Sequence, residues 1–173
     1  MANAVATTRT ARTKSVPDYT AHILRRCFVQ LLERIDTAVA AERELTWAAD
    51  GQPGGMCDPA VATHLRDAEN AWDAVTDCLA ATTAAATSAP ETCVLRAMTF
   101  CLRAVMSSES ASEFDREISA ARRLIAETCV LPNASVADRD FYQVLQAVAA
   151  RLDALDNLDL YRAGASEAGF DLN

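Results

Sequence analysis

The chain has 173 residues, of which 51% are hydrophobic and 23% are charged, and its formal net charge is −8. A chain of this length can bury roughly 70% of its unfolded surface within one domain. The acidic balance argues against general nucleic-acid binding, which requires a basic face, and against docking on anionic membranes. Glycine and proline number only five each and aromatic residues make up 6%, so the composition favours helices over sheets.

The two ends of the chain differ from the middle and predict tails on either side of one domain. Residues 1–16 are Thr-rich and basic without an acidic residue. We expect a flexible segment there, with an organelle-targeting peptide as the alternative. Residues 17–163 form the predicted domain. Residues 164–173 form an acidic tail, in which Phe170 and Leu172 are candidate anchors on a protein partner.

Apolar residues that recur every three or four positions predict the first two helices. The first is expected over residues 17–49, after the capping sequence that begins at Ser15. Its apolar seam is Leu24, Phe28, Leu31, Ile35, Ala38 and Leu45, interrupted by Glu42. A glycine-rich loop follows, and Asp58 with Pro59 predicts the start of the second helix, which ends near residue 86. The stripe of the second helix is Leu65, Ala68, Trp72, Val75 and Leu79.

Residues 90–106 predict a helix buried at the centre of the bundle, because a helix that is apolar nearly all round is normally enclosed. The segment is too short for a membrane span, which needs roughly 20 apolar residues. We therefore expect Phe100 to lie away from solvent. Its one polar stripe is Thr92, Arg96, Thr99 and Arg103. The two arginines require water or carboxylates, so ion pairs within the bundle and a groove for an acidic partner are both compatible with the pattern.

Two further capping sequences, at Ser110 and Ser135, predict the fourth and fifth helices. The fourth has an apolar face of Phe114, Ile118, Ala121, Ile125 and Thr128. The fifth has an apolar face of Phe141, Leu145, Val148, Leu152 and Leu155, with Gly164 as a possible end cap. The expected fold is all-α: an antiparallel five-helix bundle, similar to a four-helix bundle with one central or added helix.

The cysteine and histidine patterns do not match a metal site. No cysteine pair has the CxxC spacing, and neither histidine belongs to a Glu-x-x-His or His-Glu-x-x-His sequence. We therefore expect no metal and no other cofactor. The six cysteines are predicted to be reduced thiols in a cytoplasmic protein. They are Cys27, Cys57, Cys78, Cys93, Cys101 and Cys129.

A short sequence around His22 is similar to the motif of histidine-phosphotransfer domains. The five residues are Ala21, His22, Ile23, Leu24 and Arg25. The resemblance implies a four-helix bundle with an exposed histidine as the phosphoacceptor. It departs from the family at Arg26, where the family has a small glycine that gives the partner room to approach.

The leading hypothesis is a non-catalytic protein-interaction module, either a regulatory adaptor or a subunit of a larger assembly. Its predicted partner-binding residues are Arg96, Arg103, Phe170 and Leu172. The partner is expected to be a protein, with self-association as an alternative and with no nucleic acid involved. A phosphotransfer protein that uses His22 is the first alternative function. A helical sensor with a small-molecule pocket beside Trp72, Met98 or Arg103 is the second.

Overall fold

The computed structural model describes residues 16–89, 93–128 and 136–158, and these residues form five α-helices and no strand. The helices are α1 (Val16–Asp50), α2 (Ala62–Thr87), α3 (Val94–Met106), α4 (Ala111–Thr128) and α5 (Val136–Asp156). Two 3-10 turns, η1 (Gly55–Cys57) and η2 (Pro59–Val61), connect α1 to α2. The predicted all-α class and the five helices are confirmed.

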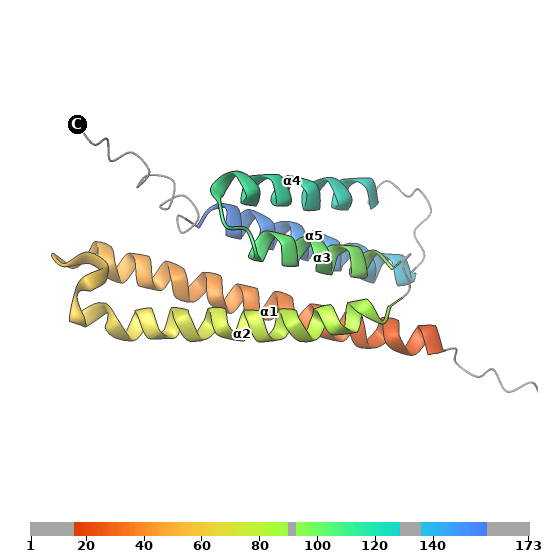
Figure 1. Ribbon diagram of the computed structural model, residues 1–173, viewed down its shortest axis with the longest axis horizontal. Helices are drawn as coiled ribbons and strands as arrows, with labels where there is room; N and C mark the ends of the chain where they lie inside the picture. Colours follow the sequence, from red (N-terminus) through yellow and green to blue (C-terminus); the bar gives the residue numbers. More distant parts are fainter. Residues whose placement is uncertain (1–15, 90–92, 129–135, 159–173) are drawn as a thin grey trace, which may run out of the picture.

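Helices α1 and α2 form a long antiparallel hairpin (Figure 1). Near the start of α1, the backbone oxygen of Cys27 accepts a hydrogen bond from Thr82 Oγ1 at 3.3 Å. Further along α1, Glu42 Oε2 accepts one from Trp72 Nε1 at 3.1 Å. The later residue of α1 therefore bonds to the earlier residue of α2, which shows that the two helices run antiparallel.

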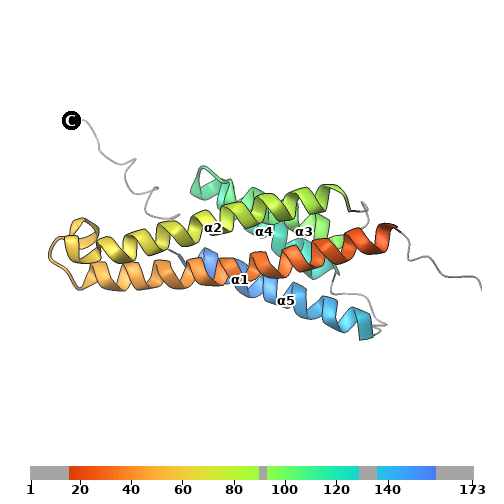
Figure 2. The same cartoon turned by 90° about the horizontal axis from the view of Figure 1, so that it is seen from below.

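Helix α5 packs beside α1 and runs parallel to it. This pair differs from the antiparallel arrangement that the sequence predicted. Arg25 forms an ion pair with Asp140 at 3.4 Å, and Arg151 forms one with Asp36. Both pairs join residues that are 115 positions apart, and a constant offset is the signature of parallel helices. The second view agrees, because α1 and α5 run the same way along the long axis (Figure 2).

The main core lies where α3 and α5 cover the first part of α1 and the last part of α2, while α4 packs on α3 and α5. Its apolar side chains come from all five helices, as their spacing predicts. The largest fully buried ones include Phe28, Leu24, Leu31, Ile35, Met98, Leu102, Ile118, Leu145, Leu152 and Leu155. Burial of each such side chain stabilises the fold by about 1.5–3 kcal/mol relative to leaving it exposed.

Helix α3 is buried on one face only, so the predicted burial of Phe100 is wrong. Leu95, Met98 and Leu102 face the core, whereas Phe100 is 38% exposed and Arg103 is exposed. Thr99 also belongs to the buried face, since it is fully buried. Its hydroxyl donates a hydrogen bond to the Leu95 carbonyl at 2.7 Å, so the buried polar group is satisfied. Helix α3 has apolar residues around most of its circumference, but its neighbours α1, α2 and α4 cover only part of that surface.

The far end of the α1–α2 hairpin extends beyond the other helices in both views (Figures 1 and 2). We call residues 43–71 the projecting hairpin. Helix α1 has 35 residues and α3 has 13, which correspond to roughly 50 Å and 20 Å. A separate small core of Leu45, Ala49, Val61 and Ala68 holds the projecting hairpin together. The Glu42–Trp72 hydrogen bond lies at its base, with Glu42 only 5% exposed.

One predicted helix start is confirmed by its hydrogen bonds, and another is displaced. Asp58 Oδ1 accepts from the backbone N–H of Ala60 at 2.9 Å, but this bond caps the 3-10 turn η2, and α2 begins only at Ala62. Ser110 Oγ accepts from the N–H of Glu113 at 3.2 Å, and Glu113 Oε2 accepts from the N–H of Glu109 at 3.1 Å. The predicted caps that involve residues 15, 91, 135 and 164 lie outside the described residues.

Among the described helices, none combines the length and the apolar character needed to span a membrane.

Candidate functional site

The outward face of α3 carries a cationic and aromatic stripe. Arg96, Phe100 and Arg103 follow one another at spacings of four and three, which places them on one side of the helix. The Arg96 guanidinium carbon lies 5.9 Å from the centre of the Phe100 ring, a cation–π contact. Arg96 Nη1 also donates to the backbone oxygen of Ala89 at 2.8 Å. Neither arginine pairs with a carboxylate of the described residues, so the expected ion pairs within the bundle are not found there.

A groove between α2 and α3 borders this stripe at Arg103. Its volume is about 480 Å³. Its lining consists of Thr76, Leu79, Ala80, Thr83, Ala84 and Thr87 from α2, with Arg103 and Ser107 from α3. Of the three residues predicted to lie beside a ligand pocket, Arg103 lines this groove, while Met98 is fully buried and Trp72 packs against the core.

The projecting hairpin exposes three large apolar side chains, none of which the sequence patterns predicted to be exposed. Trp47 is 79% exposed, Met56 is 48% exposed and Leu65 is 38% exposed. Trp47 and His64 also line a hollow of about 460 Å³ at the end of the hairpin. The predicted burial of Leu65 in the α2 stripe is wrong, because this part of α2 lies beyond the helices that cover the rest of the stripe. The greater length of the first two helices was the sequence signal for this end.

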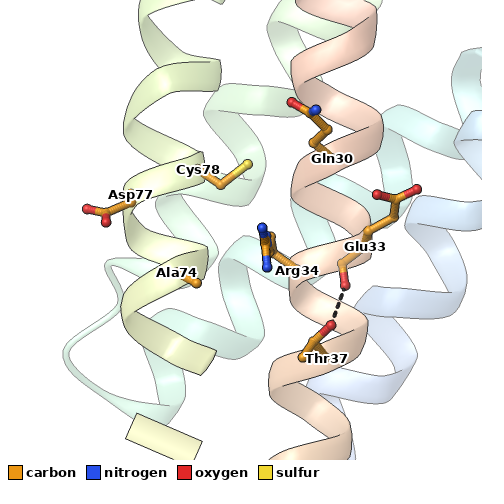
Figure 3. A pocket seen from close by; sticks show the side chains of 7 residues that line it. All are labelled: Gln30, Glu33, Arg34, Thr37, Ala74, Asp77 and Cys78. Carbon is orange, nitrogen blue, oxygen red and sulfur yellow. Dashed lines mark hydrogen bonds between the residues drawn. The ribbon is translucent and has the colours of Figure 1, made fainter. Parts of the chain in front are cut away.

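A polar cleft of about 720 Å³ lies between α1 and α2 (Figure 3). Arg34 extends from α1 toward α2, across from the small side chain of Ala74, while Asp77 points away from it (Figure 3). The remaining lining residues are Gln30, Glu33, Thr37 and Cys78. The cleft therefore combines one cation with two carboxylates and presents no surface of a single charge.

The thiols of Cys78 and Cys101 are poorly suited to nucleophilic chemistry. Burial raises the pKa of Cys78 above its ordinary value of 9.0, against the lowering effects of the Thr82 hydrogen bond and the Arg34 charge. Burial also raises the pKa of Cys101, and the nearby Glu117 charge acts in the same direction. Since the thiolate is the reactive form, both side chains stay protonated near neutral pH. The five described cysteines are free thiols.

The remaining predicted site residues do not come together. His22 is exposed on α1, and the neighbouring Arg25 is engaged by Asp140. The described residues contain no group of three or more histidine, cysteine, aspartate or glutamate side chains arranged to hold a metal ion. Phe170 and Leu172 lie outside the described residues. No protein family, curated protein or solved structure matches this chain, so its own residues carry the functional inference.

Proposed function

We propose that the protein is a non-catalytic protein-interaction module that engages a partner through its projecting hairpin. The exposed indole of Trp47 is the single observation that carries this proposal. A tryptophan side chain buries a large apolar area when it is covered and is enriched among the residues that dominate binding energy. Trp47 is 79% exposed, so nearly all of that area is available to a partner.

The setting of Trp47 supports the same proposal. The projecting hairpin also exposes Met56 and Leu65, and Trp47 lines a hollow of about 460 Å³. Its own core is small, comprising Leu45, Ala49, Val61 and Ala68. A two-helix element with so small a core gains stability when a partner covers its outer face.

Site-specific photo-crosslinking tests this proposal. A photo-reactive phenylalanine replaces Trp47 in one version of the chain and Tyr19 in a matched control. Tyr19 is an aromatic residue of the same helix and is 69% exposed. The expected result in cells that produce the protein is a discrete heavier adduct at position 47 and none at position 19. An adduct with the mass of two chains assigns the partner as a second copy.

Two results would contradict the role of the projecting hairpin. One is the absence of any adduct at position 47. The other is the same set of adducts at both positions, which would show only random collisions with abundant proteins.

The exposure of His22 favours one alternative, a phosphotransfer role. An exposed imidazole near cationic side chains can accept a phosphoryl group from an aspartyl phosphate or a phosphohistidine. Arg26 is exposed beside it and occupies the place where that family keeps a glycine. The test is transfer of radioactive phosphate from a kinase–receiver mixture to the full chain. Labelling that disappears in His22→Gln would support this alternative, and an unlabelled chain would reject it.

A further inference from the structure

We propose that the groove between α2 and α3 binds an acidic amphipathic helix of a partner protein, with Arg103 as its charge-recognition residue. This site is separate from the projecting hairpin. It is defined by the eight lining residues given above, and its volume is about 480 Å³. Shape and charge point to the same kind of occupant.

The shape of the groove fits a helix that approaches closely. Apart from Leu79, the α2 wall presents only small side chains. Thr76, Ala80, Thr83 and Thr87 follow one another at spacings of four, three and four. Rows of this spacing form the shallow surface channels into which the ridge of a second helix packs. The side chain of Leu79 adds an apolar contact at the edge of the core.

The charge of the groove selects an acidic occupant. Among the described residues, Arg103 is the only charged one that lines the groove, and it forms no ion pair with a described carboxylate. Arg25 and Arg122, in contrast, are matched within the bundle, to Asp140 and to Asp153 with Asp156. The groove therefore holds one unpaired cation on a chain whose net charge is −8, and complementary charge on a partner would steer binding to it.

The polar cleft between α1 and α2 lacks these properties. Glu33 and Asp77 line it together with Arg34, so an acidic segment would meet two like charges there. An acidic helix is therefore expected to bind in the α2–α3 groove and not in the polar cleft.

Fluorescence anisotropy with two synthetic helical peptides of about 20 residues tests the proposal. Both peptides carry an alanine and leucine face at helical spacing, flanked by glutamates in one and by lysines in the other. The full chain should bind the glutamate peptide at least about tenfold more tightly, with an affinity that weakens as salt rises. Equal affinity for the two peptides, or no binding of the glutamate peptide, would overturn the inference.

Three variants of the full chain locate the binding site. Arg103→Glu should reverse the preference between the peptides, and Ala84→Trp should abolish binding by filling the groove. Both residues are exposed, and a circular dichroism spectrum verifies that each variant folds. Arg123→Glu, an exposed position on α4, is the matched control and should bind like the wild type.

The remaining outcomes separate this site from the projecting hairpin. Peptide affinity should be unchanged in Trp47→Ala, whatever the crosslinking result at that position. Equal losses in Arg103→Glu and Arg123→Glu would overturn the inference, since they would show a general charge effect. A dimer in analytical ultracentrifugation that Ala84→Trp dissociates would also overturn it, by assigning the groove to a second copy.

Discussion

The same pair of helices behaves differently at its two ends. In the first part of α1 and the last part of α2, the neighbours α3 and α5 cover large apolar side chains such as Phe28 and Ile35, which are fully buried. In the projecting hairpin, the core shrinks to four residues and Trp47 faces solvent. One continuous hairpin therefore contributes to the main core where other helices cover it and forms an exposed surface where those helices end.

The largest effect is expected in the covered part of the hairpin. Phe28→Ala removes a fully buried aromatic ring and should lower the free energy of unfolding by about 3–5 kcal/mol. Urea unfolding followed by circular dichroism measures this change. A loss below about 1 kcal/mol would show that the main core does not depend on this position.

A smaller loss is expected in the projecting hairpin. Leu45→Ala should lower the free energy of unfolding by about 2 kcal/mol, the lower end for buried leucines, because the small core can adjust around the vacated space. Hydrogen exchange should show faster opening of residues 43–71 and little change elsewhere. If Leu45→Ala instead destabilised the whole chain as much as Phe28→Ala, the two ends would form one cooperative unit.

The hydrogen bond at the base of the projecting hairpin gives the next effect. Glu42→Ala leaves the indole N–H of Trp72 without its acceptor and should cost about 1–2 kcal/mol. Glu42→Gln keeps an acceptor oxygen and should cost less than half as much. Equal costs for the two substitutions, measured by urea unfolding, would show that the hydrogen bond is unimportant.

The ion pairs between α4 and α5 should contribute less. Arg122 bonds to Asp153 at 2.6 Å and to Asp156 at 3.0 Å, and its side chain is 41% exposed. Solvent screens pairs with this exposure, so Arg122→Ala should lower the free energy of unfolding by at most about 1 kcal/mol. The loss should shrink in 1 M salt, and a loss that is independent of salt would point to packing of the arginine stem instead.

The smallest effect is the pH dependence that arises from Cys78. Its folded-state pKa is raised above 9.0, so the protonated thiol stabilises the fold fully below the pKa of the unfolded thiol. That stability is lost as the pH rises through the folded-state pKa. As the pH rises past the ordinary thiol pKa of 9.0, the wild type should therefore lose more stability than Cys78→Ala. Cys57→Ala, at an exposed position, is the control and should lose as much as the wild type.

The sequence predicted the helices well because their signals are local. Apolar spacing gave the faces of α4 and α5, and the bond at Ser110 confirms the predicted start of α4. The exposure of Phe100 and Leu65 was not predictable in this way, because it depends on where neighbouring helices end. Hydrophobic periodicity identifies the face of a helix that can be buried, but it does not show how much of that face other helices reach.

The candidate sites were predictable only in part. Arg96 and Arg103 stood out in the sequence as charges on an apolar helix, and the structure places them on an exposed stripe. Trp47 carried no comparable signal, since a single tryptophan between a threonine and an alanine is typical of either a core edge or a surface. Its exposure became visible only with the lengths and positions of α1 and α2 in space.

Fluorescence quenching by acrylamide tests most directly whether the two ends of the hairpin differ in this way. The chain has two tryptophans, so Trp72→Phe reports on Trp47 alone and Trp47→Phe reports on Trp72 alone. The emission of Trp47 should lie at longer wavelength and be quenched several-fold more strongly than that of Trp72. Equal quenching of the two, or stronger quenching of Trp72, would contradict an exposed projecting hairpin.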